Sequence, residues 1–436
     1  MSDWSVSDLE KWDDRIKSCA ESFNLDWFPI IYEICDYYDM MGYMAYHGMP
    51  SHYSHWSYGK TFERTRQLYN QGMEGLPYEL IINSNPSIAY LMRENPIYLQ
   101  IVIMAHCIGH SDFFKNNRIF SKTRPEHTVM KFKSARDRIK SYIEDPSIGI
   151  ENVEKVLDAA HTIRFQTERN GFDRIPHDDL VQKEIDKINS ESKTALALDD
   201  IEKIPIKKDN DLLGFMIEHG DHFKDWERDI LEIVRDESQY FIPQIKTKIL
   251  NEGWASFWHY KLLHELELDS GLHLPFIKTH NQVIRPHIGA INPYHLGFHI
   301  FKKIEKNSGL DECFFVREVH DDEQALRRFI EREDCEELNL FSYSSKKSKV
   351  TIDEVSDEDG WKVVKNDLIR NTGVGGIPEI SVVETSKYGE IILEHEHDGR
   401  DLELDYADKV LNQIRYLWPK GAKLFTIIED ELWEMD

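Results

Sequence analysis

The sequence predicts an α+β protein, with a large, mainly helical N-terminal domain over residues 1–305 and a small ferredoxin-like α+β domain over residues 306–436. Two observations indicate this class. Apolar residues recur at helical spacing through most of the first 305 residues. After about residue 310, short apolar runs bounded by polar residues and glycines are typical of strands. The length of 436 residues is sufficient for two or three domains and a substantial core.

The helical domain is predicted to begin with two helices, over residues 4–16 and 28–44, where apolar and aromatic side chains recur at helical spacing. Glycine and proline predict a loop over residues 47–56. An Asn-Pro pair at residues 95–96 then provides an N-cap and a proline at the first helical position. The apolar helix that starts there is expected to end at residues 116–117.

The remainder of this domain is also predicted to be helical, apart from one polar stretch. Further helices are expected over residues 126–143, 151–170, 212–236, 243–268 and 292–304. Residues 176–212 are polar and only weakly periodic, so we expect them to form a loop or surface excursion. Leucine and isoleucine residues within this stretch argue against a disordered linker.

The C-terminal domain is predicted from alternating strand and helix patterns. Strands are expected over residues 313–316, 338–341, 349–354, 379–384, 390–394 and 423–427, and helices over residues 359–370 and 404–417. From residue 349 onward the order is strand, helix, strand, strand, helix, strand. This is the split βαβ order of a ferredoxin-like layer.

The composition excludes several classes of protein. The formal net charge is −26, whereas a protein that binds the nucleic-acid backbone over a broad surface carries the opposite sign. The five cysteines are scattered and form no CxxC pair, which fits a reducing compartment rather than a disulfide framework. The N-terminus lacks the apolar core of a secretory signal, and the most apolar stretch, residues 101–109, is too short to cross a bilayer. We therefore expect a cytoplasmic protein with no membrane span and no nucleic-acid partner.

His106 and His110 are the sharpest chemical signal in the sequence. They lie four residues apart in a predicted helix, so both side chains share one face. Two imidazoles in this arrangement bind one metal ion in zinc peptidases of the H-E-x-x-H type. The alternative is a pair of hydrogen-bonded core histidines. The metal interpretation is slightly favoured, because burying imidazoles without partners in an apolar helix is costly.

Glu252 and His259 form a second signal, in the helix predicted over residues 243–268. They are seven residues apart, two turns along the same face. A glutamate from a separate helix is the third ligand in one large class of zinc peptidases. The small residues Gly253 and Ala255 would allow two helices to approach closely. The alternative is a structural helix in which Glu252 pairs with an arginine.

Glu79 and Cys107 bear on the source of a catalytic base. Glu79 lies in an apolar run, and a buried carboxylate needs a cation, a metal or a proton; a salt bridge is an equally good explanation. Cys107 occupies the position of the H-E-x-x-H glutamate, where a neutral thiol is a poor base. The base therefore comes from elsewhere, from Glu79 or His259, or the site is not hydrolytic. The same residues would also suit iron, although the paired ExxH motifs of di-iron bundles are absent.

Several long blocks make the sequence recognisable. They are YEICDYYDMM (32–41), GMP (48–50), HWSYGK (55–60), INSNP (82–86), AYLM (89–92), HCIGHSDFFKNN (106–117), NEGWA (251–255), WH (258–259), INPY (291–294) and LGF (296–298). With these blocks the sequence resembles the stage V sporulation protein R (SpoVR-like) family over about residues 25–300.

The resemblance implies a physiological setting and a set of site residues. The family is linked to formation of the spore cortex, a peptidoglycan layer, and in bacteria that do not sporulate it resembles a stress or stationary-phase factor. Its usual associates are a serine-kinase homologue and a protein with a von Willebrand-type domain. The family pattern keeps two histidines and a glutamate that match His106, His110 and Glu252, which supports the metal interpretation. The family residue after the first histidine is commonly apolar, which argues against an ordinary metallopeptidase mechanism.

Two hypotheses follow. In the first, His106, His110 and Glu252 bind Zn²⁺, with Fe or Mn as alternatives, in a zincin-like two-helix site. His259 or Glu79 moves protons, and the protein hydrolyses an amide-type bond, for example in a peptidoglycan precursor. In the second, the protein is a non-catalytic regulatory or interaction protein that works with the kinase homologue and the von Willebrand-type partner, and the His/Glu cluster is structural.

Overall fold

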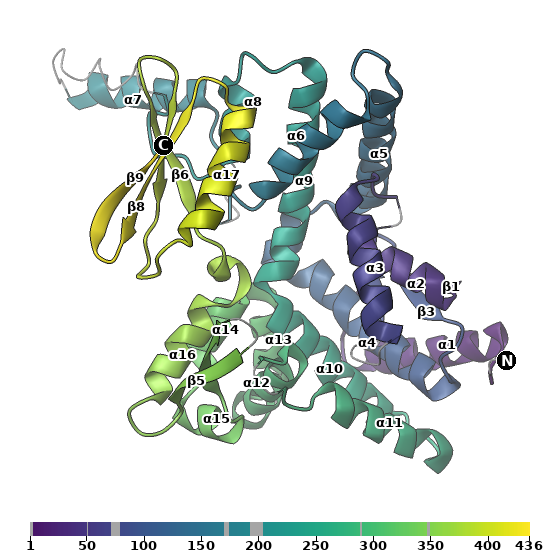
Figure 1. Cartoon of the computed structure of the whole chain (residues 1–436). Helices are drawn as coiled ribbons and strands as arrows, with labels where there is room; N and C mark the ends of the chain where they lie inside the picture. Colours follow the sequence, from purple (N-terminus) through teal and green to yellow (C-terminus); the bar gives the residue numbers. More distant parts are fainter. Residues whose placement is uncertain are drawn as a thin grey trace. The chain divides into compact units, whose positions relative to one another are not determined.

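The chain forms two compact units, each assembled from two separate segments (Figure 1). Unit 1 contains Met1–Arg136 and Pro243–Gly375, and unit 2 contains Asp137–Ile242 and Gly376–Asp436. Both are largely helical with small sheets, which confirms the predicted α+β class. The domain boundary predicted at residues 305/306 stays a prediction. The computed structural model describes residues 3–49, 51–70, 79–169, 174–191, 204–287, 290–346 and 349–436.

Unit 1 combines a helical core with two small sheets. Its helices include α1 (Val6–Ser22), α2 (Tyr37–Ala45), α3 (Trp56–Asn70), α4 (Ile97–Asn116), α10 (Lys248–Glu265), α11 (Ser270–Val283), α12 (Pro293–Ser308), α13 (Leu310–Val319), α14 (Asp322–Phe329), α15 (Arg332–Glu337) and α16 (Trp361–Arg370). Strands β1 (Ile30–Cys35), β2 (Leu80–Ile82) and β3 (Ser87–Met92) form a sheet in the order β1-β3-β2, with β1 parallel to β3. Strands β4 (Phe341–Lys346) and β5 (Lys349–Val355) form an antiparallel pair.

Unit 2 combines helices with one four-stranded sheet. Its helices include α6 (Ile150–Thr162), α7 (His177–Glu191), α8 (Leu212–His219) and α17 (Leu404–Leu417), while α5 (Thr128–Glu144) and α9 (Asp225–Lys246) each continue from one unit into the other. Strands β6 (Ile380–Thr385), β7 (Ile391–His395), β8 (Ala422–Ile428) and β9 (Glu431–Met435) pair in that order. The β7–β8 pair is parallel and the other two are antiparallel. Helix α17 packs against α6 and β8.

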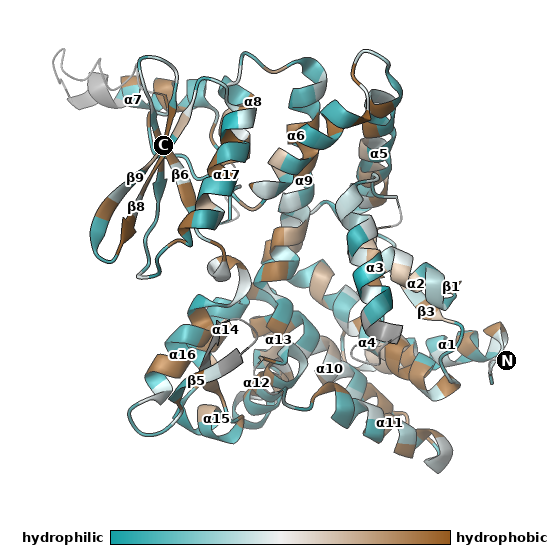
Figure 2. Cartoon of the chain, in the orientation of Figure 1, coloured by the Kyte–Doolittle hydropathy of each residue, from teal (hydrophilic) through white to brown (hydrophobic). Residues whose placement is uncertain are grey.

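Helix α4 is the centre of the unit 1 core. Most helices carry both hydrophilic and hydrophobic residues, as amphipathic helices with one buried face do (Figure 2). In α4, by contrast, every residue from Leu99 to Phe114 is buried, between α10, α1 and β3. In the described part of the chain, α4 is the one helix long and apolar enough to cross a membrane, but 89% of its most apolar window is buried in the protein. This is the behaviour of a core helix.

Small residues bring α10 close to both of its neighbours. A Cβ atom at Gly109 in α4 would lie 2.7 Å from the Cα of Ala255 in α10. A Cβ atom at Gly253 in α10 would lie 2.3 Å from the backbone carbon of Gly297 in α12. These separations are far below van der Waals contact, so only glycine allows the backbones to approach this closely. The expectation that Gly253 and Ala255 permit close helix packing is confirmed.

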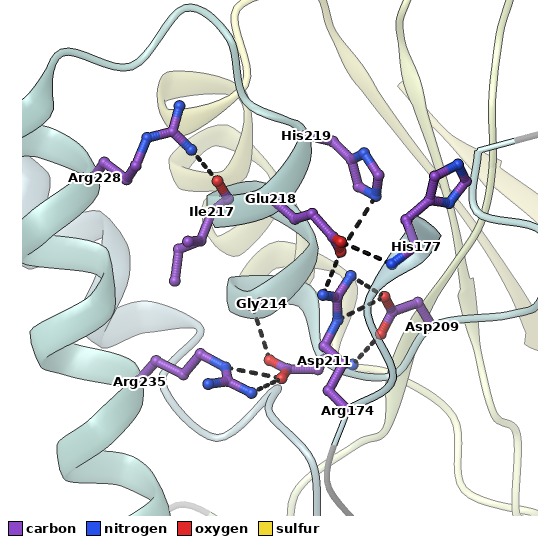
Figure 3. A network of polar contacts seen from close by, with 10 residues as sticks. All are labelled: Arg174, His177, Asp209, Asp211, Gly214, Ile217, Glu218, His219, Arg228 and Arg235. Carbon is purple, nitrogen blue, oxygen red and sulfur yellow. Dashed lines mark hydrogen bonds and ion pairs between the residues drawn. The ribbon is translucent and has the colours of Figure 1, made fainter. Parts of the chain in front are cut away.

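A network of ion pairs lies in unit 2, around the buried Asp211 and the partly exposed Arg174 (Figure 3). Arg174 forms ion pairs with Asp209 and Glu218. Arg235 donates two hydrogen bonds to Asp211, whose carboxylate also accepts an N–H from the first turn of α8. Because these charges are paired with one another, the network has a structural explanation and needs no ligand.

Two assignments of element type were wrong. In the helix predicted over residues 28–44, Ile30–Cys35 is strand β1, and only Tyr37–Ala45 is helical. The strand predicted over residues 313–316 lies within helix α13. A short apolar run is compatible with either structure, and pairing with β3 in the first case and packing on α12 in the second decides the outcome.

The ferredoxin-like layer predicted for the C-terminal region was also wrong. The expected elements largely exist, but β4 and β5 pair with each other in unit 1, while β6 to β9 form a separate sheet in unit 2. The order of elements along the chain does not fix which strands pair. The prediction also missed β9, and in residues 338–341 only Phe341 belongs to a strand.

The polar stretch predicted as a loop or surface excursion is partly helical. Helix α7 (His177–Glu191) occupies its first half, and residues 192–203 lie outside the described residues. In the loop predicted over residues 47–56, Pro50 also lies outside the described residues, and α3 begins at Trp56. Helix α10 begins at Lys248, later than predicted, because Pro243 belongs to α9.

Candidate metal centre

His106 and His110 face Glu252 across the contact between α4 and α10. The two imidazoles are buried one turn apart on α4, where the helical repeat places both on the side of α10. The Nε2 atom of His110 lies 3.3 Å from Oε2 of Glu252, and the Nε2 atom of His106 lies 3.7 Å from the same oxygen. The structure therefore brings together the three residues predicted as metal ligands.

Glu79 completes the cluster from the residue that precedes β2. Its Oε1 atom lies 3.5 Å from Nε2 of His106. One ligand atom from each of Glu79, His106, His110 and Glu252 lies within 4.8 Å of the others. We call these four residues the His/Glu cluster. Two imidazoles and two carboxylates form a donor set that could hold a divalent metal ion.

Two atoms of the cluster support this interpretation because they are buried without a hydrogen-bond partner. They are Nε2 of His106 and Oε2 of Glu252. A buried polar atom with no partner is unfavourable, by about 1–3 kcal/mol. A cation between the imidazoles and the carboxylates would satisfy both atoms at once. The residues present therefore fit a metal ion.

A second layer of polar residues contacts the two histidines from the other side of their rings. Nδ1 of His110 lies 2.8 Å from Oδ1 of Asn251. Nδ1 of His106 lies 2.9 Å from Nδ1 of His259, whose Nε2 lies 2.7 Å from Nδ1 of His280. Both nitrogens of His259 are thus engaged by other histidines. Its predicted role in proton transfer stays a prediction, and the ring lies behind His106 rather than among the ligand atoms.

Tyr294 is a site residue that the sequence prediction missed. Its hydroxyl donates a hydrogen bond to Oε1 of Glu79 at 3.3 Å, and its ring lies near that of His106, with centroids 6.0 Å apart. Asn292 caps α12 by accepting the N–H of Tyr294, which fixes the start of the helix beside the cluster. The only sequence signal was the recognisable INPY block, which carried no assigned role.

Burial and mutual contact shift the pKa values of residues in and beside the cluster. Burial raises the pKa of Glu252, but the nearby imidazoles of His106 and His110 outweigh it and hold that pKa well below its usual value. Burial lowers the pKa of His110, and the contact with Glu252 outweighs it, so the net shift is upward. Tyr294 keeps its proton, because burial and the neighbouring carboxylates raise its pKa.

The second-layer histidines are neutral at physiological pH. Burial, followed by the proximity of His280 and His106, lowers the pKa of His259 well below its usual value. Burial, with smaller contributions from His264 and His106, lowers the pKa of His280 to about 4. A neutral imidazole has one N–H donor and one acceptor nitrogen, so each ring in this chain has a defined direction of hydrogen bonding.

Cys107 and the second histidine pair do not belong to the cluster. The Cys107 thiol is fully buried, and burial together with Glu79 raises its pKa, so it stays protonated and is no base. In the other pair four residues apart, His299 bonds to Asp334 at 2.8 Å, and burial lowers the pKa of His295. His299 therefore has a structural partner, and neither histidine belongs to the His/Glu cluster.

Comparison with known proteins gives a consistent picture. A family model described as "SpoVR like protein" matches residues 3–377, a span that includes the whole His/Glu cluster. The chain is 28% identical over 470 residues to the "Uncharacterized protein YcgB" of Escherichia coli (strain K12), covering 95% of this chain and 91% of that protein. No solved structure matches the chain.

Proposed function

Because the chain belongs to the SpoVR-like family and carries the His/Glu cluster, we propose that it is a metal-dependent hydrolase that acts on an amide-type bond, with Zn²⁺ as the metal and Fe or Mn as alternatives. One observation carries the proposal. The Nε2 atoms of His110 and His106 lie 3.3 and 3.7 Å from Oε2 of Glu252. Ligands of a tetrahedral site with bonds of about 2.0–2.2 Å lie roughly 3.3–3.6 Å apart, so both separations are close to that spacing.

The ligands proposed are His106, His110 and Glu252. Two imidazoles one turn apart on one helix, with a carboxylate from a second helix, form a zincin-like arrangement. Bound zinc would supply Lewis-acid chemistry, polarising a substrate carbonyl and promoting ionisation of water. The ligand atoms come from α4 and α10, whose contact is fixed by glycine, so the protein places them without help from loops.

Glu79 is the proposed general base. Its carboxylate lies beside His106 but on a separate element, and its side chain is 14% exposed. It can accept a proton from an attacking water and deliver it to the leaving amine. Tyr294 donates a hydrogen bond to this carboxylate and orients it. The base thus comes from the residue that precedes β2, in place of the residue that follows the first histidine.

The physiological setting is proposed from the family alone. We place the reaction in spore cortex formation or in the cell-envelope physiology of stress and stationary phase, in the cytoplasm. A peptidoglycan precursor or a cell-wall regulator would supply the amide-type bond. A serine-kinase homologue and a protein with a von Willebrand-type domain are the proposed partners.

A second candidate is a non-catalytic regulatory or interaction protein. The sheet of unit 2 ends in strand β9, where Leu432 is 75% exposed and Trp433 is 44% exposed. An unpaired strand edge with exposed apolar side chains favours protein binding. Under this proposal the kinase homologue or its companion docks on β9, and the His/Glu cluster is structural.

Metal content tests the first proposal. The untagged native protein is purified without chelator, and Zn, Fe and Mn per chain are measured beside the double variant H106A/H110A. The matched control is H295A/H299A, which removes the other histidine pair four residues apart. We expect about one equivalent of metal in the native protein and the control, and none in a folded H106A/H110A variant. Native protein that stays metal-free after reconstitution would leave the interaction protein as the better proposal.

A further inference from the structure

The two histidines of the cluster are supported asymmetrically. Behind His110 stands an amide, Asn251, and behind His106 stands a chain of two further imidazoles, His259 and His280. All of these side chains are at least nine-tenths buried. Apolar residues would fill the same space without the penalty of burying polar groups. We therefore explain this polar layer by the effect of its hydrogen bonds, which fix the nitrogen of each histidine that carries the proton.

The direction of the hydrogen bond between His110 and Asn251 follows from the chemistry of the amide oxygen. The Oδ1 atom of Asn251 only accepts hydrogen bonds, so Nδ1 of His110 carries the proton and donates it. When the ring is neutral, its Nε2 atom carries the lone pair, on the side of Glu252. This is the tautomer that a metal ligand requires.

The direction of the hydrogen bond between His106 and His259 follows from the distances between His106 and its neighbours. A proton on Nε2 would point at the carboxylates of Glu79 and Glu252, which lie 3.5 and 3.7 Å away, beyond a good N–H···O hydrogen bond. A proton on Nδ1 instead donates to His259 at 2.9 Å. His259 must then donate from Nε2 to Nδ1 of His280, and the 2.7 Å separation fits that bond.

We propose that Asn251, His259 and His280 are positioning residues that hold the Nε2 lone pairs of His106 and His110 toward a common metal ion. This inference rests on the proposed metal centre and deepens it. The hydrogen bonds run outward from the metal along both branches, fixing the tautomer and the ring orientation of each ligand. Residues in this position typically change metal affinity by ~10–100-fold when they are replaced.

His280 offers the cleanest test, because it forms no hydrogen bond with any of the proposed metal ligands. Its ring packs against the rings of Tyr260 and Phe298, so phenylalanine fits the same aromatic surroundings. H280F removes the acceptor, whereas H280N keeps an acceptor oxygen near the position of Nδ1. H264F is the matched control, since His264 also contacts Tyr260 but lies outside the hydrogen-bonded chain.

The experiment is Zn²⁺ competition against a chromophoric chelator, with the Co²⁺ absorption spectrum as a report on ligand geometry. We expect H280F to bind Zn²⁺ ~10–100-fold more weakly and to show an altered Co²⁺ spectrum. H280N and H264F should remain close to wild type. On the second branch, N251L should weaken binding as H280F does, whereas N251D, which retains an acceptor, should not.

The outcomes separate the two proposals. Thermal unfolding of each metal-free variant shows that it is folded before its affinity is compared. Wild-type Zn²⁺ affinity in both H280F and N251L would overturn the positioning role and leave the metal centre standing. Loss of affinity in H280N equal to that in H280F would also overturn it, because the effect would then be structural. A wild-type chain that binds no metal would overturn both proposals.

Discussion

Replacing Gly253 with alanine tests whether the close approach of α10 and α12 holds the His/Glu cluster in place. A Cβ atom at this position would lie 2.3 Å from the backbone carbon of Gly297 and 2.4 Å from its Cα. Ordinary van der Waals contact begins at 3.4 Å, so the two helices would have to separate by about 1 Å. Both opposing atoms belong to the backbone, and no change of rotamer can relieve the overlap.

Two opposing effects determine the size of the change. Alanine is favoured over glycine in a helix by ~1 kcal/mol. Overpacking a core costs typically ~1–3 kcal/mol, and a clash between two backbones belongs at the upper end. The net loss of unfolding free energy is therefore about 1–2 kcal/mol, which lowers the thermal midpoint by roughly 2–8 °C. Because Glu252 precedes residue 253, the same shift should displace its carboxylate relative to His110 and weaken metal binding.

Thermal unfolding followed by circular dichroism, together with Zn²⁺ competition, measures both consequences. The matched control is G42A in α2, where an added Cβ atom would meet nothing within 4 Å. We expect G42A to be as stable as the wild type or slightly more stable, with unchanged Zn²⁺ affinity. The reasoning is refuted if G253A unfolds at the same temperature as G42A and binds Zn²⁺ equally well.

Three further predictions concern charge. E252Q in the metal-free protein should lower the pKa of His110, because the contact with Glu252 raises it, and NMR titration of the imidazole measures the shift. Burial raises the pKa of Asp334, but bonds from His299 and Lys303 hold it at about 2, so its carboxylate stabilises the fold above pH ~4. That contribution, up to about 2 kcal/mol, is lost as the pH falls from ~4 to ~2, and urea unfolding of wild type and D334N across this range should converge. R235M leaves a buried, unpaired carboxylate on Asp211 and should destabilise the protein by about 3 kcal/mol without changing metal content at low temperature.

The sequence was sufficient for elements whose periodicity is long and regular. The helix predicted over residues 404–417 matches α17, and that over 359–370 closely matches α16. It was insufficient where a short apolar run suits either structure, as in Ile30–Cys35, because a strand needs a partner elsewhere in the chain. The pairing of the C-terminal strands was predicted wrongly for the same reason, since the order of elements along the chain does not determine which strand edges meet.

The candidate site likewise contains residues that the sequence predicts and residues that it does not. His106, His110 and Glu252 were found because helical spacing and small neighbouring residues are local signals. Tyr294 and His280 were missed, because their proximity to the cluster arises only from the packing of α11 and α12. Sequence spacing can therefore identify candidate ligands that come together, while the residues packed around them become visible only in three dimensions.

The exposure of the cluster bears on whether it is catalytic or structural. The side chains of His106 and His110 are 4% and 5% exposed, whereas those of Glu79 and Glu252 are 14% and 18% exposed. The partly exposed side of the cluster is therefore the side of its two glutamates, although Oε2 of Glu252 is itself buried. A structural metal site is closed by protein ligands, and a catalytic one keeps an open position. The more exposed side is the one on which Glu79 lies. Under the proposed function, a substrate that approached from this side would meet the proposed base first.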